Sequence, residues 1–394
     1  MSSQLSQIVS LITDATKFVE ESFSKMIEHN VPSLDDTAPH PLDDQGACAQ
    51  LCALVARPNR TMINIFEPAS IRVVVNFNIA DHLLNKPEGL HISDLGALSG
   101  AEPQKLVRIM RLLAKQTKQT KRHLCLKDPD WGHSYSPGHA PFNFWSKYPG
   151  SIFSWYEDSG SDIAAAKGAR FGMTMKAWDE STELWAVVNA FPWDSLRQGA
   201  TVCDVGGGTG VTSMQLAKEY PNLSIVLQDL PALIELAKNE IWPKSCPAAI
   251  EDGHVEFKAF DFLMESPVKG CDVYLLKNVL HNWPDKECKK ILQGVGNIMS
   301  ADSRLLICDY IIQHANRGKT AHKSIGARPA PEPLLPNYGA GRMTQYNMDV
   351  EMMCVCNSQE RSLDHFVKLG KEAGLRFVRV WDAREASTFE FCME

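Results

Sequence analysis

The chain has 394 residues, 44% of them apolar and 22% charged, and carries a net charge of −7. This composition is typical of a globular protein, and the length favours two domains over one. The acidic balance excludes a general electrostatic attraction to nucleic acid or to acidic membrane surfaces. No apolar run approaches the roughly 18–20 residues that cross a membrane, so we expect a soluble protein without membrane partners.

The cysteines and the N-terminal segment indicate the compartment. The eleven cysteines are scattered and form no CxxC pair, a pattern that suits free thiols in a reducing environment. The N-terminal stretch MSSQLSQIVSLITDATKFVEESF carries acids inside its apolar positions and makes a poor signal peptide. We therefore expect a cytoplasmic protein.

The first 140 residues are predicted to be mainly helical. Apolar positions recur at helical spacing, and Pro103 suits the first turn of a helix. A two-stranded wing is expected to follow, so the region resembles a winged helix. The predicted elements are helices over Leu5–Ile27, Ser70–Asn85, His91–Leu98 (capped by Ser93) and Glu102–Lys115, and the wing over Thr120–Tyr135.

A winged helix raises the question of DNA binding. The third helix carries Lys105, Arg108 and Arg111. The chain as a whole is acidic, however, and so few basic residues usually form a solvated helix face. A packing or dimerisation role for residues 1–140 is therefore favoured over binding to nucleic acid.

Residues 141–198 are unusually aromatic, and we interpret them as a helical linker between two domains. Buried aromatic rings can simply hold such a linker in place, but they can also line an apolar substrate pocket. Both interpretations are compatible. The candidate pocket residues in this segment are Phe142, Trp145, Phe171 and Met173.

Strands and helices alternate from residue 199 to the end, which predicts a doubly wound, mostly parallel α/β sheet of seven strands. The last two strands are close enough in sequence to form a hairpin at one edge. Residues 314–342 are rich in Pro and Gly and are expected to form a long exposed loop. The expected strands are Thr201–Val205, Ser224–Gln228, His254–Ala259, Cys271–Leu276, Arg304–Cys308, Arg376–Trp381 and Thr388–Phe391, with helices over Val211–Tyr220, Ala232–Asn239 and Asp285–Met299.

The first of these strands runs into a glycine-rich turn, TVCDVGGGTG at Thr201–Gly210. Glycines between a strand and a helix let the backbone approach a ligand closely, so that the amides of the loop face the ligand. Ligands of open α/β sheets bind outside the carboxyl ends of the strands. Polar residues stand at those ends here, although each one alone could also be a helix cap: Asp204, Asp229, Asp261, Lys277 and Asp309.

The glycine loop does not match a phosphate-binding motif. It lacks the GxGxxG spacing, and the chain has no GxxxxGK[ST] loop. No basic residue near the loop would neutralise a pyrophosphate. An acidic site of this kind favours an uncharged nucleoside with a cationic or zwitterionic tail.

Taken together, four motifs resemble the S-adenosylmethionine-dependent O-methyltransferases, of the kind typified by plant caffeate and flavonoid enzymes. The motifs are DVGGGTG, QDLP at 228–231, DF at 261–262 and LLKNVLHNWPDKEC at 275–288. PEPLLPNYGAGR and YNMDVEMM are closer to the fungal branch of secondary metabolism. The resemblance implies a Rossmann-like catalytic domain over 199–394, the 141–198 linker, and a winged-helix-like dimerisation domain over 1–140. It also implies a homodimer, with S-adenosylmethionine as cofactor and S-adenosylhomocysteine as product.

The resemblance assigns cofactor contacts to the strand ends. Gly206 and Gly208 would lie along the methionine part, and Asp229 would hold the ribose hydroxyls. Asp261 and Phe262 would address the adenine. The full expected cofactor set is Asp204, Gly206, Gly208, Asp229, Leu230, Asp261, Phe262 and Lys277.

The resemblance also assigns the catalytic residues, and no metal is implied. His281 aligns with the general base that removes the proton of a phenol, and Asp309 and Glu360 align with two acids that orient it. Asp309 stands where the plant enzymes have Glu, so its carboxylate is one methylene further from the base. Asn282 replaces an Asp beside the base and is expected in the substrate pocket with Met352, which aligns with a methionine that packs on the aromatic acceptor.

One alternative remains open within the same family. Some fungal members no longer transfer the methyl group and catalyse dehydrations or pericyclic reactions with the cofactor retained. His133 lies near where those proteins place a pocket histidine, and His139 is a weaker case. An ordinary loop histidine is the competing interpretation of both residues.

Overall fold

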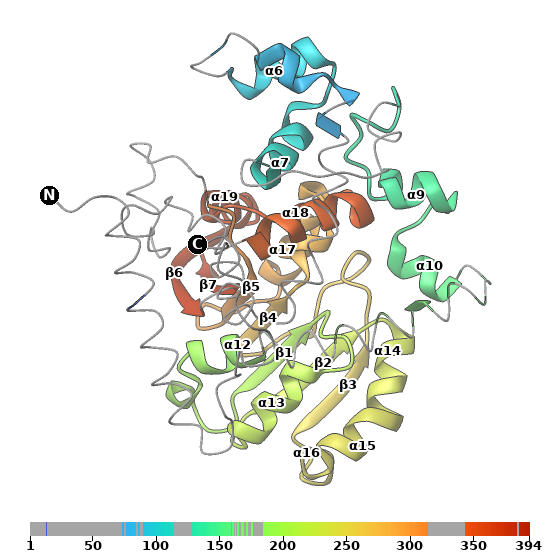
Figure 1. The fold of residues 1–394 in the computed structure, drawn as a ribbon. Coiled ribbons are helices and arrows are strands. Elements are labelled where there is room, and N and C mark those ends of the chain that lie inside the picture. The colour runs from blue at the N-terminus through green and yellow to red at the C-terminus, as the bar shows by residue number, and fades with distance from the viewer. Residues whose placement is uncertain are drawn as a thin grey trace, which may run out of the picture.

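The computed structural model describes Thr13, most of residues 73–113, residues 128–160 except 159, single positions between 162 and 175, and residues 184–313, 343–383 and 386–394. Residues 75, 84, 85 and 87–89 are also outside this set. Figure 1 shows a central sheet flanked by helices, with the N-terminal helices α6 (Ile92–Ser99) and α7 (Pro103–Leu113) beyond one end of it. The predicted Leu5–Ile27 helix and the 314–342 loop lie outside the described residues.

The sheet has seven strands in the order β3-β2-β1-β4-β5-β7-β6. β1 to β5 are parallel, and β7 pairs antiparallel with both β5 and β6. The doubly wound, mostly parallel fold and the terminal hairpin at one edge are confirmed. The strands are β1 (Thr201–Val205), β2 (Ser224–Asp229), β3 (Val255–Ala259), β4 (Val273–Lys277), β5 (Arg304–Tyr310), β6 (Leu375–Ala383) and β7 (Ala386–Met393).

The central strands are buried on both faces because their side chains alternate between two apolar cores. In β4, Val273 and Leu275 pack into the first core, whereas Tyr274 and Leu276 pack into the second. Such strands carry near-continuous runs of apolar residues, since neither face meets water. β4 is accordingly VYLLK, and its first four residues are buried.

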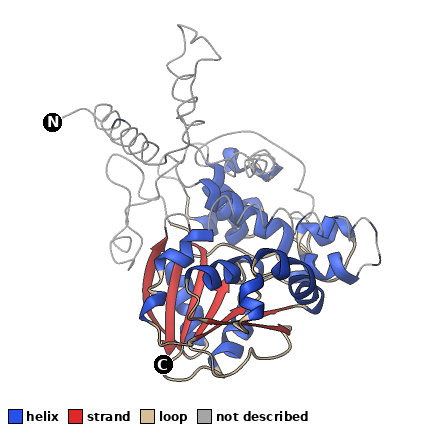
Figure 2. Ribbon diagram, turned by 90° about the horizontal axis from the view of Figure 1, so that it is seen from below, coloured by secondary structure: helices blue, strands red, loops and turns tan. Residues whose placement is uncertain are grey.

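Helices cover both faces of the sheet (Figure 2). Residues of α12, α13 and α18 contribute to the first core, and residues of α17 and α19 contribute to the second. A third, smaller core joins α13 to α14 and α15 around Trp242. These helices are α12 (Leu184–Ala190), α13 (Val211–Glu219), α14 (Pro231–Leu236) with its continuation η4 (Ala237–Ile241), α15 (Trp242–Ser245), α16 (Pro247–Glu251), α17 (Asp285–Gly296), α18 (Met343–Cys356) and α19 (Leu363–Glu372).

The N-terminal helices agree with the sequence expectation except in detail. The helix expected over Ser70–Asn85 is interrupted at Asn78, which has a φ of 51°, and continues as α5 (Ile79–Leu83). α6 is capped by the side chain of His91, which accepts from the amide of Ser93, so the predicted Ser93 cap was wrong. Glu102 accepts from the amide of Lys105 and satisfies the first turn of α7.

The predicted wing is not formed where the structure describes it. Residues 128–135 consist of turns instead of a strand, and 120–127 lie outside the described residues. Asp128 accepts from the amides of Asp130 and Trp131, which closes a tight turn and competes with strand pairing. The aromatic segment follows as η1 (Pro137–His139), α9 (Pro141–Ser146), α10 (Ile152–Asp158), α12 and η3 (Trp193–Ser195).

α7 does not present the solvated basic face expected from the sequence. Lys105 and Arg108 are only 4% and 5% exposed. These two residues are therefore occupied inside the protein and do not offer a surface for phosphates. Within the described part of the chain, no helix is long and apolar enough to span a membrane.

Candidate active site

The glycine loop after β1 is shaped by close packing. Gly206 and Gly208 have φ of 72° and 60°, in the left-handed region that favours glycine. A Cβ on Gly207 would lie 2.4 Å from the Asp204 carboxyl carbon and 2.7 Å from Leu227. The loop is thus pressed against β1 and β2, while a Cβ on Gly208 would meet nothing within 4 Å.

Asp204 supports this loop from behind. Its carboxylate is 2% exposed and accepts a 2.6 Å hydrogen bond from the hydroxyl of Ser213, on the first turn of α13. This hydrogen bond links α13 to β1, the helix and the strand that flank the glycine loop. The structure therefore places Asp204 beneath the cofactor-binding loop that the sequence predicts.

Asp229 links the end of β2 to the glycine loop that follows β1. Its two carboxylate oxygens accept from the amides of Gly208 and Leu230, each at 2.7 Å. Burial raises the pKa of Asp229, and the two amide hydrogen bonds oppose that effect. A carboxylate is therefore held against the glycine loop, as the predicted ribose contact requires.

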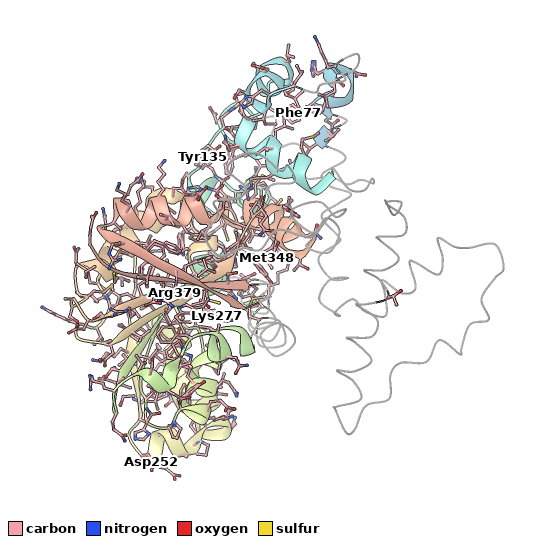
Figure 3. All side chains as sticks on the ribbon, turned by 90° about the vertical axis from the view of Figure 1, so that its left-hand side faces the viewer. Phe77, Tyr135, Asp252, Lys277, Met348 and Arg379 are labelled. Atoms are coloured by element: carbon pink, nitrogen blue, oxygen red, sulfur yellow. The ribbon has the colours of Figure 1, made fainter. Side chains whose placement is uncertain are left out.

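Phe262 lies on the other side of the loop. A Cβ on Gly206 would approach its ring to 3.1 Å, and the ring stacks edge-on to Trp283 at 5.8 Å. Asp261 beside it accepts from the amide of Leu263. Lys277 ends β4, the next strand, and Figure 3 labels it near the middle of the molecule. Phe262 and Asp229 thus lie beside the glycine loop, and Lys277 ends the strand next to β1.

His281 and Glu360 form a buried pair. His281 lies in the short turn η5 (Leu280–Asn282), and its Nδ1 is 2.8 Å from Oε1 of Glu360. Both residues are buried, at 7% and 3% exposed. This turn adjoins the glycine loop, since a Cβ on Gly206 would lie 3.0 Å from Val279. With Nδ1–H donated to the carboxylate, Nε2 carries the lone pair that can accept a proton.

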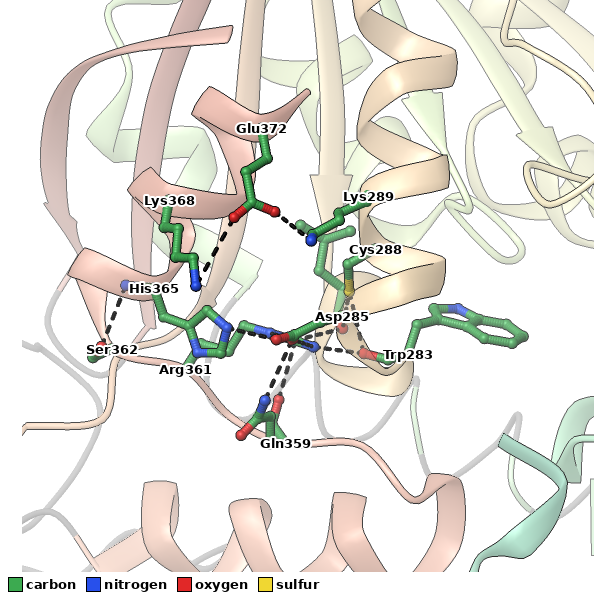
Figure 4. Close-up of polar contacts among 11 residues, drawn as sticks. Trp283, Asp285, Cys288, Lys289, Gln359, Arg361, Ser362, His365, Lys368 and Glu372 are labelled. Carbon is green, nitrogen blue, oxygen red and sulfur yellow. Dashed lines mark hydrogen bonds and ion pairs between the residues drawn. The ribbon is translucent and has the colours of Figure 1, made fainter. Parts of the chain in front are cut away.

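Arg361 fixes the turn that carries His281, and Figure 4 shows its contacts with Trp283 and Asp285. This fully buried guanidinium donates to the carbonyls of Leu280 and Trp283, at 2.9 and 2.7 Å. The thiol of Cys288 donates to the same two carbonyls, at 3.2 and 3.1 Å. The backbone on both sides of His281 is therefore held by buried donors.

Asp285 balances the charge of Arg361. One of its oxygens lies 2.9 Å from the guanidinium, and the other is 2.8 Å from Nε2 of His365 (Figure 4). Burial acts to raise the pKa of Asp285, but the hydrogen bond from His365 and the charge of Arg361 outweigh it. They hold the pKa of this carboxyl well below its usual range.

Of the other predicted catalytic and pocket residues, Asp309 and Met352 are buried and Asn282 is half-buried. Asp309 is fully buried near the end of β5. Asn282 donates to the carbonyl of Asn278 and so stabilises the turn. Met352 is 8% exposed and belongs to the first core, on α18.

Aromatic rings connect the linker to this site. Phe171 contacts Phe153 at 6.3 Å between ring centroids, and Phe153 contacts Trp283 at the same separation. Trp283 in turn meets Phe262. A second series runs from Tyr156 beside Phe171 through Trp155 to Phe142 and Trp145. The linker therefore borders Trp283, which follows the turn that carries His281.

Three predicted pocket residues lie elsewhere or outside the description. His133 is exposed and lines a separate cavity of about 470 Å³ between α5, α6 and residues 128–133. Trp145 is 66% exposed, and Met173 lies outside the described residues. His139 stacks on Trp131 at 4.6 Å, which supports its interpretation as a loop histidine.

Sequence reasoning missed the residues that hold the turn carrying His281. Arg361 adjoins Glu360, so a search for buried charges next to the predicted acid could have found it. Asp285 was interpreted only as a helix start, which it is, and its bonds to Arg361 and His365 span more than 70 residues. Among the described residues, no group of His, Cys, Asp and Glu is placed to hold a metal ion.

The sheet order, the glycine loop and the acids at the strand ends define a nucleoside-binding α/β protein with a buried His–carboxylate pair. Comparison with known proteins gives the family. Residues 163–328 match the O-methyltransferase domain model. A protein of Phanerochaete chrysosporium, 3-O-methyltransferase 2, is 34% identical over 391 residues, which cover 88% of this chain and 85% of that protein. The chain belongs to the S-adenosylmethionine-dependent O-methyltransferase family.

Two further comparisons agree with this assignment. The 4-O-methyltransferase 1 of Phanerochaete chrysosporium is 28% identical and covers 86% of this chain and 85% of that protein. The structure of NcsB1, an O-methyltransferase from neocarzinostatin biosynthesis in complex with S-adenosyl-L-homocysteine and 1,4-dihydroxy-2-naphthoic acid, shares the fold with a TM-score of 0.50. It is 18% identical, and the alignment covers 90% of this chain and 100% of that one.

Proposed function

We propose that the protein transfers a methyl group from S-adenosylmethionine to a hydroxyl of an aromatic or polyketide-type small molecule in fungal secondary metabolism, with His281 as general base. The observation that carries the proposal is the buried pair of His281 and Glu360, 2.8 Å apart beside the glycine loop. A base oriented by a carboxylate is what deprotonation of a weakly acidic hydroxyl requires.

The residues around the loop fit the cofactor. Gly208 offers space where a Cβ would meet no atom within 4 Å, and Asp229 places a carboxylate beside it. Phe262 presents an aromatic ring on the opposite side, suited to packing on a purine. In the proposed complex, Asp229 accepts from the ribose hydroxyls and Asp261 with Phe262 holds the adenine.

The bound cofactor supplies an electrophilic methyl group on its sulfonium. A phenol has a pKa near 10 and is a weak nucleophile at neutral pH. In the proposed reaction, Nε2 of His281 takes the phenol proton, while Glu360 holds the proton on Nδ1 and stabilises the imidazolium that forms. Arg361 keeps the turn rigid, so the ring nitrogen stays aligned with the acceptor hydroxyl.

The aromatic border supports an aromatic acceptor. Phe171, Phe153 and Trp283 form a continuous series that reaches the turn carrying His281. The similar fold of NcsB1 is seen in a complex with 1,4-dihydroxy-2-naphthoic acid, which is an aromatic molecule with hydroxyl groups. The names of the two Phanerochaete proteins differ in the position that they specify, 3-O and 4-O, so the methylated position is not part of the proposal.

The decisive experiment measures the fate of the methyl group. The purified protein is incubated with S-adenosylmethionine carrying a labelled methyl group and a panel of phenols, and products are identified by mass spectrometry. Labelled ether together with S-adenosylhomocysteine supports the proposal. Conversion of an acceptor without gain of the label would instead support the dehydratase or pericyclase alternative and contradict methyl transfer.

We also propose that the protein acts as a homodimer through residues 1–140, with the linker at 141–198 and the catalytic domain at 199–394. The resemblance to the plant and fungal enzymes supports this arrangement. Light scattering coupled to gel filtration measures the mass directly. A mass near 43.8 kDa at micromolar concentration, that of a single chain, would contradict the dimer.

A further inference from the structure

Helix α7 carries two buried cations, Lys105 and Arg108. Lys105 and Arg108 are three residues apart and therefore share one face of the helix. Both are at least 95% buried. A buried charge is costly unless it is paired, so their partners indicate what this face of α7 does.

Arg108 pairs with Asp349 in the middle of α18. Its Nε lies 2.9 Å from Oδ1 of Asp349, and Nη2 donates to the backbone carbonyl of the same residue. Asp349 is 1% exposed. The guanidinium therefore fixes both the side chain and the backbone of one residue of α18.

The same oxygen of Asp349 also contacts the backbone of Glu360. Oδ1 also accepts a 2.9 Å hydrogen bond from the amide of Glu360, which follows α18 in a non-helical segment. The carboxylate of Glu360 then meets Nδ1 of His281 at 2.8 Å. A continuous series of short polar contacts thus runs from α7 to the base: Arg108, Asp349, Glu360, His281.

Lys105 holds the same segment by a second route. Its Nζ donates to the carbonyl of Ser134 at 2.7 Å, and this carbonyl also accepts from the side chain of Asn357 at 2.9 Å. Asn357 donates as well to the carbonyl of Ser136 and has a φ of 54°, so its place at the end of α18 is closely fixed. Arg108 therefore contacts α18 directly, while Lys105 shares the Ser134 carbonyl with Asn357, which precedes Glu360.

We propose that Arg108 and Asp349 are positioning residues for the general base, through the amide of Glu360. This inference rests on the proposed role of His281. The amide of Glu360 sets the direction of its side chain, and a hydrogen bond to imidazole weakens steeply when its angle or length changes. Loss of the Arg108–Asp349 pair would leave the Asp349 carboxylate without the guanidinium that orients it toward that amide, and Glu360 would hold His281 less firmly in the Nδ1–H tautomer.

The test compares Arg108→Met, Arg108→Lys and Asp349→Asn with wild-type protein. Arg197→Met is the matched control, because Arg197 forms a two-point pair with Asp272 on the exposed surface. We expect Arg108→Met to lower kcat at least about tenfold, with KM and the affinity for S-adenosylhomocysteine within about twofold of wild type. Arg108→Lys should recover part of the loss, and Arg197→Met should change kcat by less than about twofold.

A double-mutant comparison separates positioning from general damage. In a Glu360→Ala background the side-chain contact between Glu360 and His281 is absent, so adding Arg108→Met should lower kcat by less than about twofold further. An equal fractional loss in both backgrounds would overturn the proposal, as would an unchanged kcat in Arg108→Met. Should that variant fail to fold, Asp349→Asn, which retains an oxygen for the Glu360 amide, is compared in the same two backgrounds.

A spectroscopic readout keeps this test independent of methyl transfer. ¹⁵N chemical shifts of labelled histidines report the tautomer of His281, assigned by its absence in His281→Ala. Wild type should show the Nδ1–H form, and Arg108→Lys and Asp349→Asn should show a mixture with Nε2–H. The same single tautomer in all three proteins would overturn the positioning role, even if no acceptor were methylated and the proposed function had failed.

Discussion

Nδ1 of His281 and Oε1 of Glu360 lie 2.8 Å apart, although 79 positions separate the two residues in the sequence. The first is carried by the turn after β4, and the second follows α18. Arg361, next to Glu360, donates to the carbonyls on both sides of His281. The segments that carry His281 and Glu360 are therefore held together twice. One link is the contact between the two side chains, and the other is formed by the bonds from the Arg361 guanidinium to backbone carbonyls beside His281.

Substitution of His281 or Glu360 should lower kcat without weakening the binding of the cofactor. We expect His281→Ala to reduce kcat at least about 10²-fold and Glu360→Gln at least about tenfold, because a base without its orienting carboxylate loses the correct tautomer. Asp309→Asn, a matched change at a fully buried acid of the same region, should cost less than Glu360→Gln. Steady-state methyl transfer and calorimetry with S-adenosylhomocysteine measure both quantities, and His254→Ala is the control. Full turnover by His281→Ala would remove the base assignment.

Asp229 should control cofactor affinity. Asp229→Ala removes the acceptor of the Gly208 and Leu230 amides as well as the proposed ribose contact. We expect the affinity for S-adenosylhomocysteine to fall at least about tenfold, corresponding to about 1.4 kcal/mol. Titration calorimetry measures the change, with Asp252→Ala, an exposed residue at the far end of the molecule in Figure 3, as control. Equal affinities of the two variants would discard this role.

Alanine substitutions at Gly207 and Gly208 should separate the effect of steric crowding on stability from the effect of backbone strain. Gly207→Ala places a methyl group 2.4 Å from the Asp204 carboxyl carbon, so we expect about 2 kcal/mol or more of destabilisation. Gly208→Ala meets no neighbour within 4 Å and is destabilised only by its φ of 60°, by roughly 1 kcal/mol. Urea unfolding monitored by circular dichroism compares the two, and the reverse order would contradict the packing described for the loop.

The Asp285 carboxylate should make stability depend on acid pH. Its pKa is lower in the folded protein than the value of about 3.9 expected in the unfolded chain, so the unfolded state binds more protons between these two values. The contribution is complete above about pH 5 and is lost as the pH falls through the folded pKa.

Asp285→Asn tests this dependence. The Asp285 side chain is 41% exposed, and solvent screens its charge, so we expect a loss of about 1–3 kcal/mol at pH 7. The difference from wild type should shrink below about pH 4, where the carboxyl of Asp285 begins to bind a proton in the unfolded chain but not yet in the folded protein. Urea unfolding from pH 3 to 7 measures it, with Asp302→Asn on an exposed turn as control. A difference that stays constant with pH would show that the charge of Asp285 is not what stabilises the fold.

The sheet was predictable from sequence because its strands are short apolar runs bounded by polar residues and turns. β1 has the predicted ends, and the other strands differ by a few residues. The acids at the strand ends could be located for the same reason. α18 was not predicted as a helix, because it is buried on almost every side and includes buried polar residues such as Asn347 and Asp349. A helix of that kind shows no apolar stripe.

The role of α7 could not be predicted from local sequence. Lys105 and Arg108 resemble any solvated basic pair until their partners are known, and Asp349 is 241 positions away from Arg108. The contacts of His281 and Arg361 are similarly distant in sequence. Only the resemblance to a known family indicated His281 and Glu360 in advance, and it gave no indication of the residues that hold them.

α18 packs on the N-terminal helices and on the sheet within one continuous apolar core, which includes Leu106 and Ile109 of α7 and Val350 and Met353 of α18. Folding of the N-terminal region and of the sheet is therefore coupled, and heat should unfold the described parts in a single cooperative transition. A fragment that begins at residue 141 would leave the partner surface of α7 on α18 open to water and prone to self-association. The N-terminal helices of this protein therefore cannot be replaced by those of a relative on their own. The residues of α18 that contact α7 would have to be changed at the same time.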